Sequence, residues 1–185
     1  AIILEINSPG GSAVASDEIA SAVKKTEKPV IALIREVGAS GGYWIASAAD
    51  HIIAHKMSIT GSIGVISSYL EFSGLMGDYG VTYERLVAGE SKDIGTPFKK
   101  LEPTERAILE AKLAKIHDYF ITEIAQNRNL PEEDIRKLAT GEFFLGIEAL
   151  EYKLIDEVGD ITAVEKYLQD TQGIEQPEYI IYEHQ

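Results

Sequence analysis

Hydrophobic and polar positions in the first half of the chain switch repeatedly between the two-residue period of strands and the longer period of helices. Apolar runs of strand length cover Ile2–Ile6, Pro29–Ile34 and Ile52–Ala54. The stretch Ala13–Lys25 has helical spacing, and a short packed helix is predicted over Trp44–Ala49. This β-α-β-α-β order predicts a parallel sheet with crossover helices.

Weaker signals follow in the rest of the chain. A fourth strand is expected through Ser62–Ile66, a helix over Leu70–Tyr79 and a strand over Val81–Val87. A long helix is predicted over Pro103–Asn127, because apolar residues repeat along one stripe after a proline suited to a first turn. The remaining expected elements are helices over Pro131–Ala139, Ile147–Tyr152 and Thr162–Gln169, short apolar pieces over Glu142–Leu145 and Leu154–Val158, and an edge strand over Tyr179–Tyr182.

Length and composition bound the class of protein. The 185 residues, of which 45% are hydrophobic and 25% charged, suit one globular domain: a core over residues 1–160 and a C-terminal helix and tail over 161–185. The formal net charge of −13 argues against nucleic acid or an anionic membrane surface as the main partner. Cysteine is absent, which excludes disulfides and thiolate chemistry.

The chain begins in the middle of a strand pattern, without an initiator methionine, and contains no apolar stretch of membrane-spanning length. We therefore expect it to be an N-terminally truncated piece of a longer protein, from which an N-terminal anchor has been removed.

Two glycine-rich turns are the candidates for chemistry. Ser8-Pro9-Gly10-Gly11 follows the first strand, and Gly38-Ala39-Ser40-Gly41-Gly42-Tyr43 joins the second strand to a helix. Both turns leave parallel strands in the same direction, so they can lie side by side at the edge where ligands gather. Ser40 is then placed as a nucleophile. The Gly10-Gly11 segment can expose a backbone N–H, which together with the N–H of Gly41 makes a two-donor oxyanion hole. The alternative is a glycine-rich turn that only lets the backbone pass closely.

A nucleophilic serine needs a base, and the residues alone do not settle which group serves. The four histidines are His51, His55, His117 and His184, and none has a convincing spacing from the serine. Lys92 differs from the other lysines because it lies in a glycine-bounded loop after a predicted strand.

Four linked motifs then match a known family. The chain resembles the catalytic domain of the signal peptide peptidase A (SppA) family, which are serine peptidases with a Clp-protease/crotonase-like α/β fold. The resemblance covers most of residues 1–160 and rests on the segments Asn7–Ser12, Ala39–Tyr43, Thr60–Val65 and Ser91–Gly95, which occur in the family order.

The resemblance implies roles for individual residues. Ser40 would be the nucleophile, Lys92 the general base, Ser62 the residue that holds the lysine, and Gly11 a donor of the oxyanion hole. No metal or organic cofactor is implied. The implied fold has repeated β-α-β units, a mostly parallel sheet and a long helix, and the first strands of the family domain are missing.

The resemblance also implies partners and a location. We expect peptide substrates such as signal-peptide remnants, a ring-like or dome-like homo-oligomer, and membrane attachment through the missing N-terminal segment, with the catalytic domain outside the cytoplasm. Three alternatives remain: the Clp protease itself, a crotonase-like acyl-CoA enzyme, and a non-catalytic membrane-associated scaffold. The first is disfavoured because Ile63–Ile66, where its histidine would fall, contains none.

Overall fold

In the computed structural model, which describes residues 1–175 and 177–182, the described residues form one six-stranded sheet. The strand order is β5-β4-β2-β3-β6, and β1 pairs with β2 as well. Every pair is parallel except β4 with β5. The predicted α/β class with a mostly parallel sheet is therefore confirmed.

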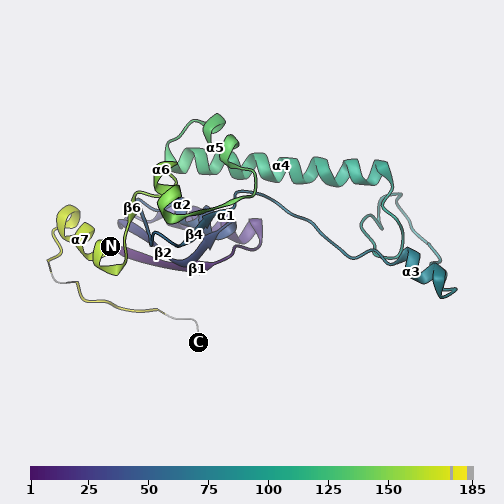
Figure 1. Ribbon diagram of the computed structural model, residues 1–185, viewed down its shortest axis with the longest axis horizontal. Coiled ribbons are helices and arrows are strands. Elements are labelled where there is room, and N and C mark those ends of the chain that lie inside the picture. Colours follow the sequence, from purple (N-terminus) through teal and green to yellow (C-terminus); the bar gives the residue numbers. More distant parts are fainter. Residues whose placement is uncertain (176, 183–185) are drawn as a thin grey trace. The chain divides into compact units, whose positions relative to one another are not determined.

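The elements are labelled in Figure 1. The strands are β1 (Ile2–Ser8), β2 (Val30–Ala39), β3 (His51–Ala54), β4 (Ile59–Gly61), β5 (Phe143–Leu145) and β6 (Glu157–Val158). The helices are α1 (Ala13–Lys25), α2 (Gly41–Ser47), α3 (Ser73–Asp78), α4 (Pro103–Arg128), α5 (Glu132–Leu138), α6 (Gly146–Glu151) and α7 (Ile161–Gln172).

The run of apolar residues in β2 is continuous because both faces of the sheet are covered. Side chains of a strand point alternately to opposite faces. Val30, Ala32 and Ile34 belong to the large core cluster that includes residues of α1, α2 and α4. Ile31 and Leu33 belong to a second cluster, which α7 covers. The result is a three-layer arrangement with helices on both sides of the sheet.

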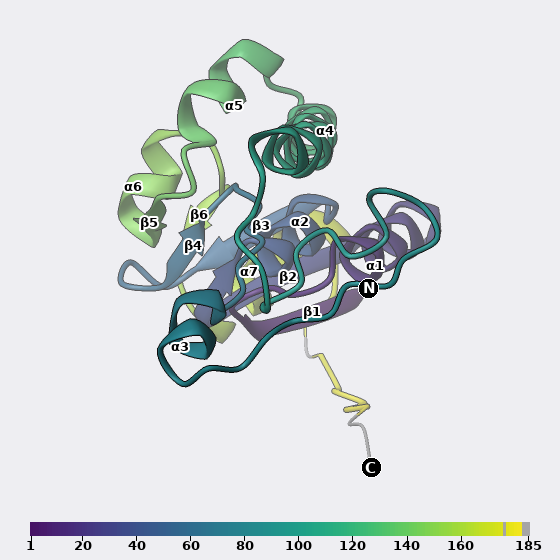
Figure 2. The ribbon, with the colours of Figure 1, turned by 90° about the vertical axis from the view of Figure 1, so that its right-hand side faces the viewer.

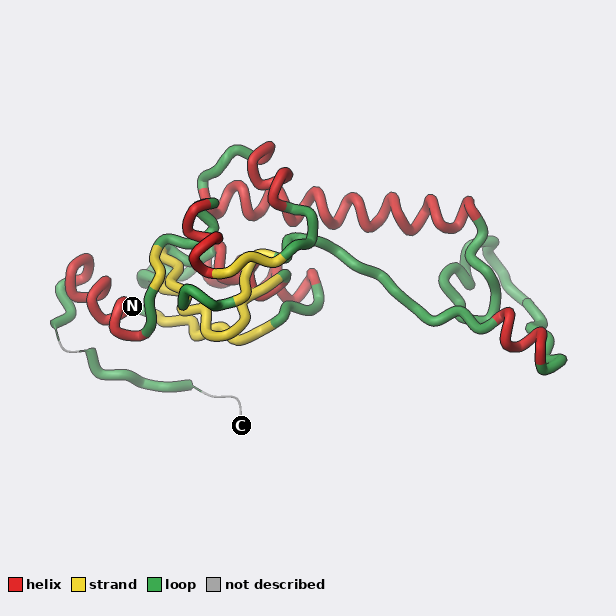
Figure 3. The backbone as a smooth tube through the Cα atoms, in the orientation of Figure 1, coloured by secondary structure: helices red, strands yellow, loops and turns green. Residues whose placement is uncertain are grey.

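The chain divides into two compact units. The first unit comprises residues 1–64 and 119–185 and contains the sheet, and the second comprises residues 65–118. In the second unit, residues 65–102 are loops and turns apart from α3 (Figure 3). The helix α4 contributes residues to both units, and its predicted apolar stripe is fully buried only toward its C-terminal end, at Phe120 and Ile124.

The last turns of α4 hold α2 in place. Figure 2, which looks along α4, shows α2 between this helix and the sheet. The indole of Trp44 is 3% exposed and stacks on Phe120 at a centroid distance of 4.6 Å. At the other end of α2, the Asn127 amide donates to the Ser47 hydroxyl at 2.9 Å, and this hydroxyl donates to the Trp44 carbonyl at 2.7 Å. A helix as short as α2 is marginal alone, so these contacts stabilise it.

Several boundaries differ from the prediction. The fourth strand ends at Gly61 instead of running through 62–66, because Ser62 has a φ of 50° that an extended strand does not allow. The predicted strand over 81–87 is wrong, because its residues have no pairing partner among the described residues. The edge strand over 179–182 is wrong for the same reason. Of the helix predicted over 70–79, only α3 forms.

The packing of α2 yields a prediction about stability. Trp44→Ala should lower the free energy of unfolding by about 3–5 kcal/mol, as expected when a buried indole leaves a cavity. Trp44→Phe should cost less than half as much, because a ring remains on Phe120 and the indole N–H has no hydrogen-bond partner among the described residues. Urea unfolding followed by circular dichroism is the measurement, since this is the protein's single tryptophan.

Val14→Ala is a suitable control for the unfolding experiment, because Val14 is 68% exposed on α1. Equal losses for Trp44→Ala and Trp44→Phe would contradict a role for the ring stack.

Candidate active site

Ser40 lies between the end of β2 and the start of α2, as the sequence predicts. Its backbone has a φ of 52° and a ψ of −122°, a combination uncommon for residues other than glycine. The Ser40 N–H donates to the Gly61 carbonyl at 2.8 Å, and its own carbonyl accepts from the Trp44 N–H at 2.9 Å. Its hydroxyl makes no capping hydrogen bond to α2. The backbone is thus held at both ends, while the hydroxyl has no hydrogen-bond partner in the part of the chain that the structure describes.

Ser62 lies beside Ser40 at the same edge of the sheet. Because β2 and β4 pair in parallel with Ala39 opposite Gly61, the two serines follow the ends of neighbouring strands, which lie ~4.8 Å apart. The N–H of Ser62 donates to the Glu142 carbonyl at 2.9 Å. Its hydroxyl donates to the Gly141 carbonyl at 3.2 Å, which leaves the oxygen lone pairs available as acceptors.

The two glycine-rich turns contact each other, which confirms the prediction that they lie side by side. Gly10 has a φ of 107°, and a Cβ there would stand 2.8 Å from both the Gly41 nitrogen and the Ser40 Cβ. A Cβ on Gly42 would stand 2.8 Å from the Ser8 carbonyl oxygen. These approaches require glycine.

The N–H groups of Gly11 and Gly41 are both available near Ser40. Gly41 is the first residue of α2, where N–H groups have no partner within the helix. No acceptor for the Gly11 N–H occurs among the described residues. A Cβ built on Gly41 would lie 3.3 Å from the Gly11 nitrogen, so the two turns present their amides in one small region. This arrangement can stabilise an oxyanion formed at Ser40.

Lys92 lies in the second unit, so the structure describes its loop but not its distance from Ser40. The Lys92 side chain is exposed. The backbone N–H of Lys92 donates to the Gly89 carbonyl at 3.0 Å in a turn. The loop is anchored by an ion pair between Arg85 and Asp93 at 2.6 Å. The structure thus brings together four of the predicted residues, Ser40, Ser62, Gly11 and Gly41, which all lie in the first unit.

His51 lies far from Ser40 within the first unit. His51 pairs with Ile31 in the sheet. Ser40 follows Ile31 by nine residues, which at ~3.3 Å each place it about 30 Å farther along the strand. Its ring stacks on Tyr167 at 4.0 Å and lies 3.4 Å from the Glu157 carboxylate. These contacts give His51 a structural role in attaching α7 to β3 and β6.

His55, the other described histidine of the first unit, also lies away from Ser40. His55 follows Ala54, which pairs with Ile34, six residues before Ser40 and thus about 20 Å along the strand. His117 belongs to the second unit, and His184 falls outside the described residues.

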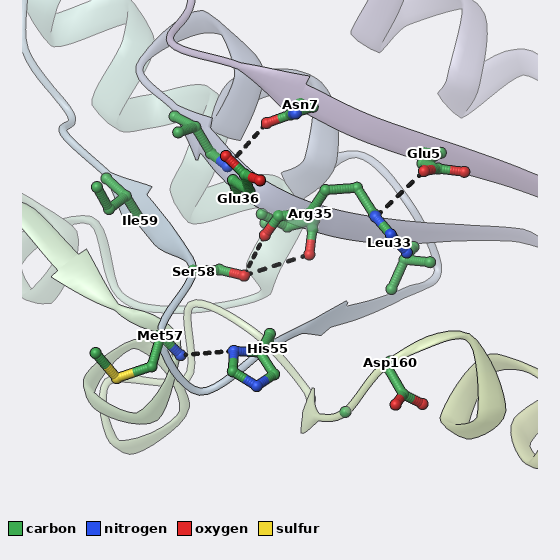
Figure 4. A pocket seen from close by; sticks show the side chains of 13 residues that line it. Glu5, Asn7, Leu33, Arg35, Glu36, His55, Met57, Ser58, Ile59 and Asp160 are labelled. Atoms are coloured by element: carbon green, nitrogen blue, oxygen red, sulfur yellow. Dashed lines mark hydrogen bonds and ion pairs between the residues drawn. The ribbon is translucent and has the colours of Figure 1, made fainter.

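A groove of about 680 Å³ on the first unit is lined by another serine and a histidine, Ser58 and His55 (Figure 4). Ser58 donates its hydroxyl to the Arg35 carbonyl, and Nδ1 of His55 accepts from the Met57 N–H at 3.2 Å. The Ser58 hydroxyl and His55 Nδ1 are therefore both hydrogen-bonded to the backbone, and they do not form a nucleophile and base pair.

A second set of polar contacts ties α2 to the segment that follows α6. The Tyr43 hydroxyl donates to the Leu154 carbonyl at 2.7 Å, and burial raises the pKa of the Tyr43 phenol well above its usual value. Arg128 at the end of α4 pairs with Asp156 at 2.6 Å. These contacts keep the Tyr43 phenol neutral in the helix that begins after Ser40.

Sequence reasoning missed the segment that holds Ser62. Gly141 and Glu142 accept from the side chain and the N–H of Ser62, although about 80 residues separate them. No local sequence pattern predicts a contact between residues so far apart. Among the described residues no group of three or more potential metal ligands is clustered. No helix in the described part of the chain is long and apolar enough to cross a membrane.

Comparison with known proteins places these residues in a family context. The model of peptidase family S49 matches residues 22–175. The chain is 34% identical over 183 residues to a putative protease of Methanocaldococcus jannaschii, covering 98% of this chain and 59% of the relative. It is 36% identical over 183 residues to the putative signal peptide peptidase SppA of Enterococcus faecium, covering 94% and 53%.

A third relative is Protease 4 of Haemophilus influenzae, 36% identical over 162 residues, which cover 86% of this chain and 26% of the relative. The chain thus spans somewhat more than half of the first two relatives and about a quarter of the third.

The Asp93 ion pair beside Lys92 yields a prediction about pH. The hydrogen bond from Arg85 is the main cause that lowers the pKa of Asp93 to about 2, from an ordinary 3.8. A lowered pKa stabilises the folded loop above pH 3.8, and this contribution is lost as the pH falls from 3.8 toward 2. An NMR titration of the Asp93 carboxyl should give a midpoint near 2, and Arg85→Ala should return it toward 3.8. An unchanged midpoint in Arg85→Ala would contradict this assignment.

Proposed function

Because the chain belongs to peptidase family S49, the family of signal peptide peptidase A, we propose that it is a serine peptidase with Ser40 as nucleophile and Lys92 as general base. The observation that carries the proposal is the geometry at Ser40, whose free hydroxyl lies at the head of α2 beside the N–H groups of Gly11 and Gly41. A hydroxyl next to two unpaired donors suits acyl transfer through a tetrahedral intermediate.

The proposed reaction proceeds in two halves. Neutral Lys92 takes the proton from Ser40 while the serine oxygen attacks the scissile carbonyl, and the oxyanion accepts from Gly11 and Gly41. Collapse breaks the C–N bond, and the lysine returns its proton to the leaving amine. Water, deprotonated by the lysine, then attacks the acyl-enzyme and releases the acid product and the free serine.

The proposal requires a neutral amine on the base. Removal of water around an ammonium disfavours its charged form, so covering the lysine would favour the neutral amine. Lys92 is exposed in the structure, so a bound peptide or a neighbouring subunit has to cover it. Ser62, whose hydroxyl donates to the Gly141 carbonyl, can then accept an N–H of the amine and orient its lone pair toward Ser40.

Substrate and location are part of the proposal: the substrate is suggested by the name of a relative, and the location by the resemblance to the SppA family. The relative from Enterococcus faecium is called a putative signal peptide peptidase. We propose that the present protein degrades signal peptides or other membrane-associated peptides outside the cytoplasm, attached to the membrane by sequence that precedes this chain.

The dyad is tested by single substitutions. Ser40→Ala and Lys92→Ala should each abolish hydrolysis of a fluorogenic peptide, with the circular dichroism spectrum unchanged. Lys100→Ala is the matched control, because Lys100 is an exposed lysine of the same unit and should retain wild-type turnover. Wild-type turnover in Lys92→Ala would rule out the lysine as base, and full activity in Ser40→Ala would rule out a serine peptidase.

The orienting role of Ser62 is tested separately. Ser62→Ala should lower kcat about tenfold or more, because a hydrogen bond to the amine contributes about 1 kcal/mol or somewhat more. The pH dependence of kcat should shift as well, since the amine loses an acceptor. A rate and pH profile identical to those of the wild type would leave Ser62 as a residue of the turn alone.

We also propose that the protein acts as a homo-oligomer in which a lysine serves the serine of a neighbouring subunit. Mixing inactive Ser40→Ala and Lys92→Ala chains should then recover activity, because some sites combine an intact Ser40 with an intact Lys92. No recovery despite proven co-assembly would place each dyad within one chain, and a fully active monomer in light scattering would contradict the assembly.

A further inference from the structure

Ser16 is a buried serine in the first turns of α1, with an exposed fraction of 5%. Its N–H and its hydroxyl both donate to the Ser12 carbonyl, each at 3.0 Å. The N–H alone already satisfies this carbonyl, as in any helix. Alanine also has the higher helix propensity. The hydroxyl is therefore not required for α1 to form, and its position calls for another explanation.

The hydroxyl lies where the two candidate oxyanion turns meet. A Cβ built on Gly41 would collide with the Ser16 oxygen, and it would stand 3.3 Å from the Gly11 nitrogen and 3.4 Å from the Ser16 Cβ. The Ser16 hydroxyl, the Gly41 Cα and the Gly11 amide thus surround one point. Through Ser12 the same hydroxyl is bonded to the end of the loop that carries Gly11.

We propose that Ser16 is a positioning residue of the oxyanion hole, which fixes the Gly11 turn against the first residue of α2. It contacts neither the substrate nor the reacting atoms, and it acts through the N–H groups of Gly11 and Gly41. Removing the hydroxyl leaves a gap between the turns and one fewer bond to the Ser12 carbonyl, so the two donors no longer converge. This inference rests on the proposed peptidase function.

A peptide aldehyde is the sharpest kinetic probe, because the serine O–H adds across its C=O bond and the former carbonyl oxygen occupies the oxyanion hole. Ser16→Ala should weaken aldehyde inhibition and lower kcat by about tenfold, a fraction of the 10²–10³ lost when one donor is removed outright. KM should stay within twofold. Ser21→Ala, a half-buried serine of the same helix, should match the wild type in all three values.

The kinetic outcomes separate the two proposals. A wild-type protein that neither cleaves peptides nor binds the aldehyde would refute the peptidase function. An active wild type whose aldehyde inhibition is unchanged in Ser16→Ala would overturn the role of Ser16 alone.

A size exchange tests the same contact without any assay of activity. Gly41→Ala should lower Tm, because the new methyl collides with the Ser16 hydroxyl. Adding Ser16→Ala should restore part of the loss, since the two Cβ atoms would then stand 3.4 Å apart, an ordinary contact, while the Gly11 nitrogen remains at 3.3 Å. A double variant no more stable than the sum of the two single effects would show that the hydroxyl does not fill this space, and would overturn the proposal.

Discussion

The parallel register at the end of β2 is the constraint on which the candidate site depends. The strand pairs on one side with β1, where Ser8 is opposite Gly38, and on the other with β4, where Ala39 is opposite Gly61. The residue after Ala39 therefore emerges between two strand ends. A shift of register by one residue would turn every side chain to the other face of the sheet, and the hydroxyl with it.

The same register supports the unusual backbone conformation of Ser40. A positive φ at a serine costs of order 1–3 kcal/mol and persists only where the surroundings impose it. The bond from the Ser40 N–H to the Gly61 carbonyl, the close approach of Gly10 and the stack of Trp44 on α4 together impose this conformation. Sheet, loop and helix each contribute one of these restraints.

Much of this arrangement could be predicted from the sequence. The continuous apolar run before the Ser40 turn indicates a strand buried on both faces, and glycines after parallel strands indicate turns at one edge. The resemblance to the SppA family is confirmed by the family match over residues 22–175. The limits were physical. Periodicity shows which residues are apolar, but it does not show which neighbouring strand a segment pairs with. The strand predicted over Val81–Val87 therefore has no partner among the described residues. The bond between Ser62 and Gly141 had no local signal either.

The contacts that support Ser40 and its neighbours join residues far apart in the sequence. The sequence separation of these contacts sets the order in which the candidate site can form. Trp44 stacks on Phe120, and Ser62 is held by Gly141 and Glu142. During synthesis, Ser40 leaves the ribosome roughly 100 residues before its last supports, several seconds at typical rates of ~5–20 residues per second. A nascent chain therefore carries Ser40 before the contacts that support its turn can form. The geometry of the Ser40 turn is a property of the completed fold, and a growing chain lacks its full set of supports until residues 141–142 are in place.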